Sequence, residues 1–333
     1  MASERRVVCV LGMHRSGTSA VTGALATLGV ALGDQLLPPA PDNPRGFFED
    51  ARLRQVNERL LELVGLSATS IRVPRLTDAD HAALAALEDE AVAIVQAAFP
   101  PGTLWGFKDP RSSRVAPFWQ RVFARTGSAD VYVLMVRHPA AVARSLATRQ
   151  SMPAGTALIL WFEHTLMALR ATLARTAVAV DYDRLVEAPA AQLSRVAERL
   201  GLEAPPAASA ADQFDPGLRH AKEDPADPSW AGGAASLLEL YGLCLKLAAD
   251  ELELAAPEVA AATEALETRL GQALEFLGLV DGSAEGRIQR LEKYAASQAE
   301  GVAFWKEQAT RWEDEAKWWR QQAESWERTA RSG

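Results

Sequence analysis

Val7-Val-Cys-Val-Leu-Gly-Met-His-Arg-Ser-Gly-Thr-Ser19 is the stretch of sequence that decides the fold. It begins with an apolar, mostly β-branched run over 7–11, which predicts a buried strand. A glycine loop follows over 12–18, and 19–28 has the composition of a helix. Further strands are expected at 104–108, 131–136 and 177–180, and helices at 51–63, 79–97, 140–148, 157–175 and 190–200. Strands that alternate with helices favour an α/β fold, in which a central parallel sheet lies between two helical layers.

The composition predicts a globular protein and excludes several classes of function. The chain has 333 residues, of which 48% are hydrophobic, and its net charge is −8. A general nucleic-acid binder is not expected, because phosphate contacts need a surplus of Lys and Arg. Cys9 and Cys244 lie in apolar runs, which predicts buried thiols rather than a disulfide or a zinc site. No apolar run has the length of a signal peptide or a membrane span, so we expect a cytoplasmic protein with no membrane span.

Two later segments differ in composition from the rest of the chain. Residues 203–235 are rich in proline and predict a lid-like loop within a main domain at 1–280, with a helical pair between 236 and 279. The tail at 286–333 carries heptads with alanine at most of one set of core positions and tryptophan at most of the other, namely Trp305, Trp312, Trp319 and Trp326. A lone helix that exposed these indoles would present a large apolar patch. We therefore expect a coiled-coil-like helical extension that forms a homo-oligomer or binds a partner protein; the alternative is a helix folded back on its own domain.

The loop after the first strand has the features of a phosphate-binding loop. Glycines let backbone amides turn toward an anion, and the following helix adds partial positive charge at its N-terminus. The spacing of Gly12, Gly17 and Ser19 matches the nucleoside-triphosphatase loop G-x-x-x-x-G-K-[ST] except that Thr18 replaces the lysine. That lysine normally reaches the β- and γ-phosphates, so its absence argues against hydrolysis of ATP or GTP. The strand at 131–136 is also followed by Arg137, where a magnesium-binding strand would place an aspartate.

Several segments together resemble one enzyme family. Gly12-Met-His-Arg-Ser-Gly-Thr-Ser19 looks like the 5′-phosphosulfate loop of sulfotransferases that use 3′-phosphoadenylyl sulfate (PAPS), in the arginine variant of tyrosylprotein and many bacterial members. The further similar segments are Asn43-Pro-Arg-Gly-Phe-Phe-Glu-Asp50, Phe107-Lys-Asp-Pro-Arg111, Arg137-His-Pro-Ala-Ala-Val-Ala-Arg-Ser145 with Arg149, and Asp181-Tyr-Asp-Arg-Leu-Val186. The resemblance covers about residues 5–280 and implies a P-loop-type three-layer sandwich. It also implies PAPS as co-substrate, no metal, and transfer of a sulfuryl group to a hydroxyl of a glycan, glycolipid or small metabolite.

The resemblance also implies roles for particular residues. Arg15, the amides of 16–18 (Ser16, Gly17 and Thr18) and the Ser19 hydroxyl would bind the 5′-phosphosulfate, and His14 is either a further phosphate contact or a spacer. The 3′-phosphate would be bound by Arg137, Ser145 and Arg149, and Tyr182 would help to hold the nucleotide. Arg137 at the end of a strand also fits the general rule that open α/β sheets bind ligands at their carboxyl edge.

The acid–base residues are less determined by the sequence. Lys108 is the candidate for stabilising the bridging oxygen or the transferring group, and Glu49 is the candidate base, because its aromatic neighbours would raise a carboxyl pKa. Asp50, Asp109 and His14 are rivals for the base. Glu49 has the alternative role of an acidic residue at a helix start, and Lys108 with Asp109 that of a structural ion pair.

Two other functions remain open at this level. One is a kinase or other phosphoryl transferase, and a magnesium requirement would distinguish it. The other is an inactive scaffold that assembles partners through the tryptophan heptads.

Overall fold

The computed structural model describes residues 5–40, 43, 46–203 and 234–274, and the isolated positions 306, 310, 311, 317 and 320. Internal contacts divide the chain into Met1–Leu270 and Gly271–Gly333, and the first unit carries everything described below unless stated otherwise. The predicted lid, apart from its ends, and the predicted domain boundary near 280 lie outside the described residues. The heptad tail lies there too, except for the five isolated positions. None of the helices in the described ranges is both long enough and apolar enough to cross a membrane.

The centre of the fold is a parallel sheet. In the described part of the chain its strands are β1 (Arg5–Leu11), β2 (Leu104–Lys108), β3 (Ser128–Val136) and β4 (Thr176–Asp181), in the spatial order β2-β1-β3-β4. All neighbouring strands pair in parallel. The predicted strands are therefore confirmed, with β3 beginning three residues before its predicted start at 131. The chain moves outward from β1 first to β2 and then to β3, so the order reverses at the boundary between β1 and β3.

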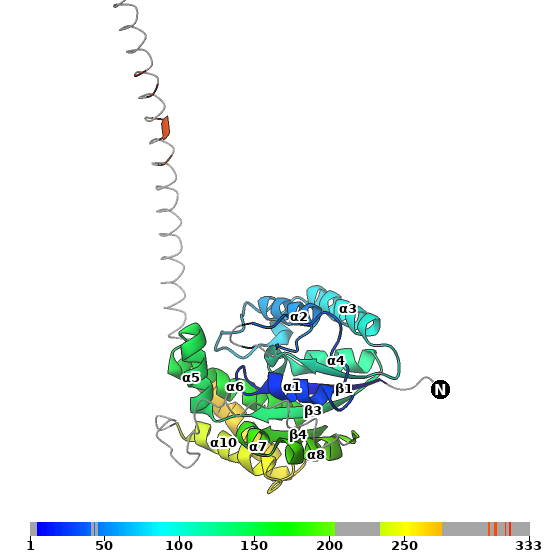
Figure 1. Cartoon of the computed structure of the whole chain (residues 1–333). Helices are drawn as coiled ribbons and strands as arrows, with labels where there is room; N and C mark the ends of the chain where they lie inside the picture. Colours follow the sequence, from blue (N-terminus) through cyan, green and yellow to red (C-terminus); the bar gives the residue numbers. More distant parts are fainter. Residues whose placement is uncertain are drawn as a thin grey trace, which may run out of the picture. The chain divides into compact units, whose positions relative to one another are not determined.

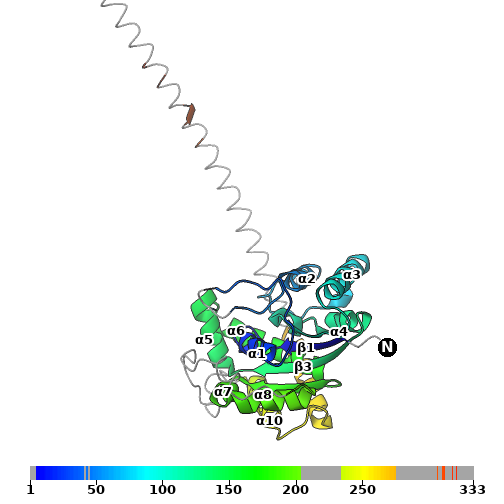
Figure 2. The ribbon, with the colours of Figure 1, turned by 45° about the vertical axis from the view of Figure 1, so that its right-hand side comes forward.

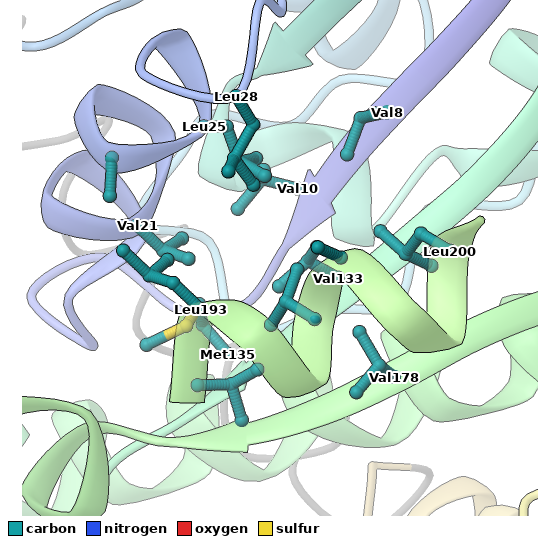
Figure 3. Close-up of a cluster of buried hydrophobic side chains, with 14 of the residues drawn as sticks. Val8, Val10, Val21, Leu25, Leu28, Val133, Met135, Val178, Leu193 and Leu200 are labelled. Atoms are coloured by element: carbon teal, nitrogen blue, oxygen red, sulfur yellow. The ribbon is translucent and has the colours of Figure 1, made fainter. Parts of the chain in front are cut away.

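One face of the sheet is covered by α1 (Thr18–Ala26) and α8 (Pro189–Leu200). Alternate residues of β1, β3 and β4 point toward these helices, as Figure 3 shows for Val8, Val133 and Val178. Since every second residue of a strand faces the same side, the remaining strand residues point to the opposite face. Burial on both faces explains why the strands are nearly continuous apolar runs.

The opposite face is covered by α4 (Ala116–Arg125) and α6 (Ala154–Thr172), while α10 (Ala235–Ala248) packs along β4 and contacts α6. An aromatic cluster joins β2 to α4, with Phe107 and Trp119 at 4.3 Å between ring centroids. The sequence did not predict α4, in which three aromatic residues in ten give a weak helical propensity. The three layers confirm the predicted fold class.

The remaining helices surround the sheet. They are α2 (Ala51–Glu62), α3 (His81–Ala98), α5 (Pro139–Gln150) and α7 (Tyr182–Glu187), with short 3₁₀ turns at Leu76–Asp78 and Pro110–Ser113 and further helical residues at 257–274. In Figure 1 α2 and α3 lie side by side, and α7, α8 and α10 lie near β4; Figure 2 shows the same three helices together after a 45° turn. Helices were expected at α2, α3, α5 and 257–274, but not at the two 3₁₀ turns or at α7, which is only six residues long.

Candidate functional site

The loop between β1 and α1 has a backbone that depends on glycine and on one strained residue. Gly17 is the N-cap of α1 with φ 88°, and Arg15 adopts φ 68°, a left-handed conformation that is uncommon for residues with a Cβ. The ring of Tyr182, at the carboxyl end of β4, lies directly against Gly17, so that a Cβ there would come within 2.9 Å of Cε2 of the tyrosine. Glycine at this position therefore allows both the turn and the approach of the ring.

The residues predicted to bind the 5′-phosphosulfate and those predicted to bind the 3′-phosphate lie next to one another. Arg137, which follows β3, donates from Nη1 to the carbonyl oxygen of Arg15 over 2.9 Å, and this bond supports the strained loop. Arg15 in turn donates from Nε to Oγ of Ser145 on α5 over 2.9 Å. The guanidinium of Arg137 also lies over the ring of Tyr182, 4.3 Å from its centroid. The carboxyl ends of β1, β3 and β4 thus bring together Arg15, Arg137, Ser145 and Tyr182.

Arg149, the third arginine assigned from the resemblance to the 3′-phosphate, has different surroundings. It lies near the C-terminus of α5, is exposed, and its guanidinium lies 5.7 Å from the ring centroid of Phe47. Phe47 belongs to the segment that carries Glu49, so Arg149 connects α5 to that segment.

The loop also contains a buried hydroxyl group that has no hydrogen-bond partner. Ser16 is 1% exposed, and its Oγ bonds to nothing in the part of the chain that the structure describes. A buried polar group without a partner costs free energy, and such groups are uncommon away from functional sites. Because Ser16 lies one residue before the N-cap of α1, an anion bound at this helix N-terminus would satisfy it. The residues present therefore fit a phosphate or phosphosulfate group.

Ser19 and Lys108 form the other half of the site. Lys108, the last residue of β2, bonds from Nζ to Oγ of Ser19 over 3.1 Å and to the carbonyl oxygen of Phe47 over 3.1 Å. Its third partner is Oε1 of Glu49, at 2.6 Å, and both side chains are almost completely buried. Burial raises the pKa of Glu49, and the opposing charge of Lys108 lowers it, with a net rise above the ordinary value. The two predicted acid–base residues are therefore in direct contact.

Two of the rival carboxylates have structural partners. Asp50 is the N-cap of α2, where it accepts from the backbone amide of Arg52, and it also forms an ion pair with the Arg52 side chain at 2.6 Å. The helix-start role proposed as an alternative for Glu49 thus belongs to its neighbour. Asp109 accepts from the amide and the side chain of Arg111. The alternative of a Lys108–Asp109 ion pair is not seen, since each residue has another partner.

His14, the remaining rival, lies at the edge of a buried polar cluster. Its ring is edge-on to that of His164 on α6, with 6.0 Å between centroids. Burial, together with the nearby charges of Arg111 and Lys108, lowers the pKa of His14 to about 3. His14 is therefore uncharged at neutral pH.

Three supporting residues were not predicted from the sequence. Ser113 accepts from the amide of Gly12 over 2.9 Å and braces the start of the phosphate loop. Asn57 on α2 is fully buried and donates to Asp109 over 2.9 Å, while its own oxygen accepts from the indole of Trp119. His164 contacts the loop through His14. These contacts join residues far apart in the chain, so a local pattern does not reveal them. Only Ser113 lies close to a segment that the sequence analysis identified, Phe107–Arg111.

Comparison with known proteins identifies a family. A model of a family described as the sulfotransferase family matches residues 8–206. The sulfotransferase domain of an olefin synthase from Synechococcus PCC 7002 is similar to this chain, with 19% identity and a TM-score of 0.41, over 73% of this chain and 95% of the other. The sulfotransferase STF1 from Mycobacterium tuberculosis H37Rv is similar with 13% identity and a TM-score of 0.38, over 72% of this chain and 77% of the other. A search of curated proteins found no significant match.

Proposed function

The chain belongs to the sulfotransferase family, and from this premise we propose how its residues bind the donor and activate the acceptor. The family transfers a sulfuryl group from PAPS to an acceptor. We propose that the acceptor group is a hydroxyl of a glycan, glycolipid or small metabolite. The observation that carries the proposal is the meeting of Arg15, Arg137, Ser145 and Tyr182 beside a loop whose buried Ser16 hydroxyl has no partner among the described residues.

The proposed donor site has two anion-binding parts. The backbone amides of 16–18, the Ser16 hydroxyl and Arg15 would bind the 5′-phosphosulfate, at the N-terminus of α1, where the helix dipole favours negative charge. Arg137 and Ser145 would bind the 3′-phosphate, with Arg149 as a further cation from the same helix as Ser145. Tyr182 would hold Arg137 in position through the contact between its ring and the guanidinium. Two charged groups on one nucleotide explain why arginines from two strand ends converge here.

The proposed chemistry uses Lys108, Glu49 and Arg15. Glu49 as a carboxylate would accept the proton of the acceptor hydroxyl, while the hydroxyl oxygen forms a bond to sulfur and the bond from sulfur to the nucleotide breaks. The ammonium group of Lys108 would keep Glu49 ionised, since it lies 2.6 Å from the carboxylate. Lys108 also contacts Ser19 in the loop, so it connects the proposed base to the place where negative charge develops on the leaving group. Arg15 would stabilise the same charge from the other side of the loop.

The family match favours this function over the kinase and scaffold alternatives. Thr18 in place of the P-loop lysine agrees with that preference. Lys108 comes from β2 instead, and it contacts the loop through Ser19.

The experiment that tests the proposed donor site is calorimetric titration with the product nucleotide 3′-phosphoadenosine 5′-phosphate (PAP), with ADP and AMP for comparison. Wild type is expected to bind PAP more tightly than AMP, because AMP lacks the 3′-phosphate. Arg137→Ala should weaken PAP binding by roughly 10- to 150-fold, since a charge-assisted hydrogen bond contributes about 1.5–3 kcal/mol. AMP binding should change much less in this variant.

A matched control is Arg175→Ala. Arg175 is also an arginine next to a strand, but it precedes β4 at the amino edge of the sheet and pairs with Asp130. This variant should bind PAP like wild type. Equal binding of PAP and ADP by wild type, or an unchanged PAP affinity in Arg137→Ala, would contradict the proposed 3′-phosphate site.

A further inference from the structure

We propose that Phe48 is a positioning residue for Glu49, which it holds beside Lys108 by packing its ring against α1. The catalytic importance of Glu49 rests on the proposed function. The placement of Phe48 does not, because it follows from contacts within the protein. Phe48 takes no part in the nucleotide contacts or the proton transfer described above, so its role is to fix the base rather than to react.

The backbone of Phe48 is strained. Its φ is 55°, in the left-handed region, which is uncommon for residues with a Cβ and rarer still for bulky ones. Strain of this kind persists only where the surrounding contacts over-determine the conformation, and it is concentrated at functional sites. Another described residue with a positive φ, Arg15, belongs to the phosphate loop. The conformation of Phe48 therefore needs contacts that hold it in place.

The ring of Phe48 is accommodated by a glycine in α1. Gly23 is a buried residue in the interior of this helix, where glycine is less favourable than alanine. Its backbone is helical, so no turn requires a glycine there. A Cβ at Gly23 would lie 2.9 Å from Cζ and 3.0 Å from Cε2 of Phe48. Room for the aromatic ring is therefore the structural reason for glycine at this position.

The residues on both sides of Phe48 are anchored through their backbone. The carbonyl oxygen of Phe47 accepts from Nζ of Lys108 over 3.1 Å. The carbonyl oxygen of Glu49 accepts from the amide of Leu37 over 2.9 Å. These two bonds, together with the contact between the ring and α1, hold the left-handed turn.

The strained residue lies between two groups that bind the same nitrogen atom. Nζ of Lys108 donates to the carbonyl oxygen of Phe47 and to Oε1 of Glu49, over 3.1 Å and 2.6 Å. Rotation of Phe48 to an ordinary negative φ would turn the Glu49 side chain relative to that carbonyl, and Lys108 could not keep both partners. The left-handed turn therefore directs the carboxylate to the ammonium group. Asp50, the next residue, is fixed separately as the N-cap of α2.

The first test is urea unfolding of a double-mutant cycle with Gly23→Ala and Phe48→Gly, the second of which removes the ring and still permits a left-handed backbone. In wild type, a methyl group at Gly23 meets the ring, and this contact offsets the gain in helix propensity. In the Phe48→Gly background, Gly23→Ala should raise the urea midpoint. Gly242→Ala in α10, where a Cβ meets nothing within 4 Å, should raise the midpoint equally in both backgrounds. An equal effect of Gly23→Ala in both backgrounds would overturn the proposal.

The second test follows the titration of Glu49 by NMR spectroscopy of the full chain with ¹³C-labelled glutamate, with the signal assigned by Glu49→Gln. In wild type, burial raises the pKa of Glu49 and the charge of Lys108 lowers it, with a net rise above the ordinary value; Asp109 raises it and Arg111 lowers it. Phe48→Gly should let the carboxylate reach solvent, so the pKa should move toward its ordinary value. The α10 control variant should leave the pKa unchanged. A pKa that does not move in Phe48→Gly would overturn the positioning role.

The third measurement is kcat with PAPS and a methyl glycoside or simple alcohol that wild type sulfates. Phe48→Gly is expected to lower kcat roughly 10²-fold, as for a misplaced catalytic group, while PAP affinity stays close to that of wild type. In the Glu49→Gln background, Phe48→Gly should change kcat little, because the group that it positions is already absent. The same loss of kcat in both backgrounds would show a general structural role and overturn the proposal.

Failure of the proposed function would give a different pattern. If PAP does not bind wild type, or if Glu49→Gln keeps the full rate, the proposed donor site or the proposed base is wrong. The unfolding cycle and the titration need no turnover, so they still decide whether Phe48 holds Glu49 in place.

Discussion

Replacing Gly17 by alanine tests whether the phosphate loop and the arginine site depend on one another. The substitution adds a single methyl group at a position with φ 88°, where it would lie against the ring of Tyr182 and 3.3 Å from Cε of Met135. The methionine chain is flexible and can move. The tyrosine ring is 9% exposed and has the guanidinium of Arg137 over it, so its displacement also moves the arginine.

The expected magnitude has two parts. A left-handed backbone costs an alanine about 1–2 kcal/mol, and this part lowers stability without touching the ligand site. Displacing Tyr182 removes a cation–π contact of about 0.5–2 kcal/mol and misplaces Arg137, whose proposed hydrogen bond to the 3′-phosphate would be worth about 1.5–3 kcal/mol. At the low end these terms sum to about 2 kcal/mol in binding, which corresponds to a roughly 30-fold weaker affinity for PAP.

Gly29→Ala separates the two parts. Gly29 also has a left-handed backbone, with φ 80°, but a Cβ there meets nothing within 4 Å. We expect both variants to lose about 1 kcal/mol or more of stability in urea unfolding. Only Gly17→Ala should lose PAP affinity in calorimetric titration. If it binds PAP as tightly as Gly29→Ala does, the inference that the Tyr182 ring positions Arg137 is wrong.

Two further predictions concern buried carboxylates. Glu49→Gln should lower kcat by roughly 10²–10⁴-fold, as for loss of a general base, with little change in PAP affinity. Wild-type activity should fall as the pH drops through a pKa above the ordinary 4.5, because burial raises the pKa of Glu49 and the carboxylate is the active form. An undiminished rate in Glu49→Gln, with exposed Glu62→Gln as control, would contradict its role as base. Glu163 is paired with Arg114, and burial raises its pKa from 4.5 to about 7. The folded form therefore binds more protons than the unfolded form between these values, so stability should fall by up to about 3 kcal/mol as the pH rises through this window. Urea unfolding at pH 5 and 8 should show this loss in wild type and not in Glu163→Gln; equal pH dependence in both would contradict it.

Local sequence patterns were sufficient to predict the strands of the sheet and the loop after β1. Each strand is an apolar run bounded by charge, glycine or a turn, and these signals do not depend on distant contacts. Arg137 was identified because a charged residue directly follows a buried strand. The parallel order then places every such strand end at one edge of the sheet, and this is why residues 122 positions apart, Arg15 and Arg137, meet.

The pairing of side chains could not be read from the same patterns. Lys108 and Asp109 are adjacent in the sequence, and one alternative was that they form an ion pair. Successive residues at a strand end point to opposite faces of the sheet. Lys108 accordingly reaches Ser19 on the α1 side, whereas Asp109 reaches Asn57 on the other. The contact between Lys108 and Glu49 spans 59 positions and depends on how the segment before α2 crosses the sheet edge.

The structure also limits which carboxylate is available as the base. Asp50 is committed to the amides at the start of α2, and Asp109 to Arg111 and Asn57. Glu163 is enclosed with Arg114, which in turn binds the backbone carbonyls of the 67–72 loop. If these three carboxylates are excluded as the proton acceptor, Glu49 remains. Its only strong partner among the described residues is the ammonium group of Lys108. Unlike Asp50, Glu49 caps no helix in the described part of the chain, so its contact with Lys108 can open toward a substrate without releasing a helix end. The structural roles of the neighbouring acids therefore support Glu49 as strongly as its own surroundings do.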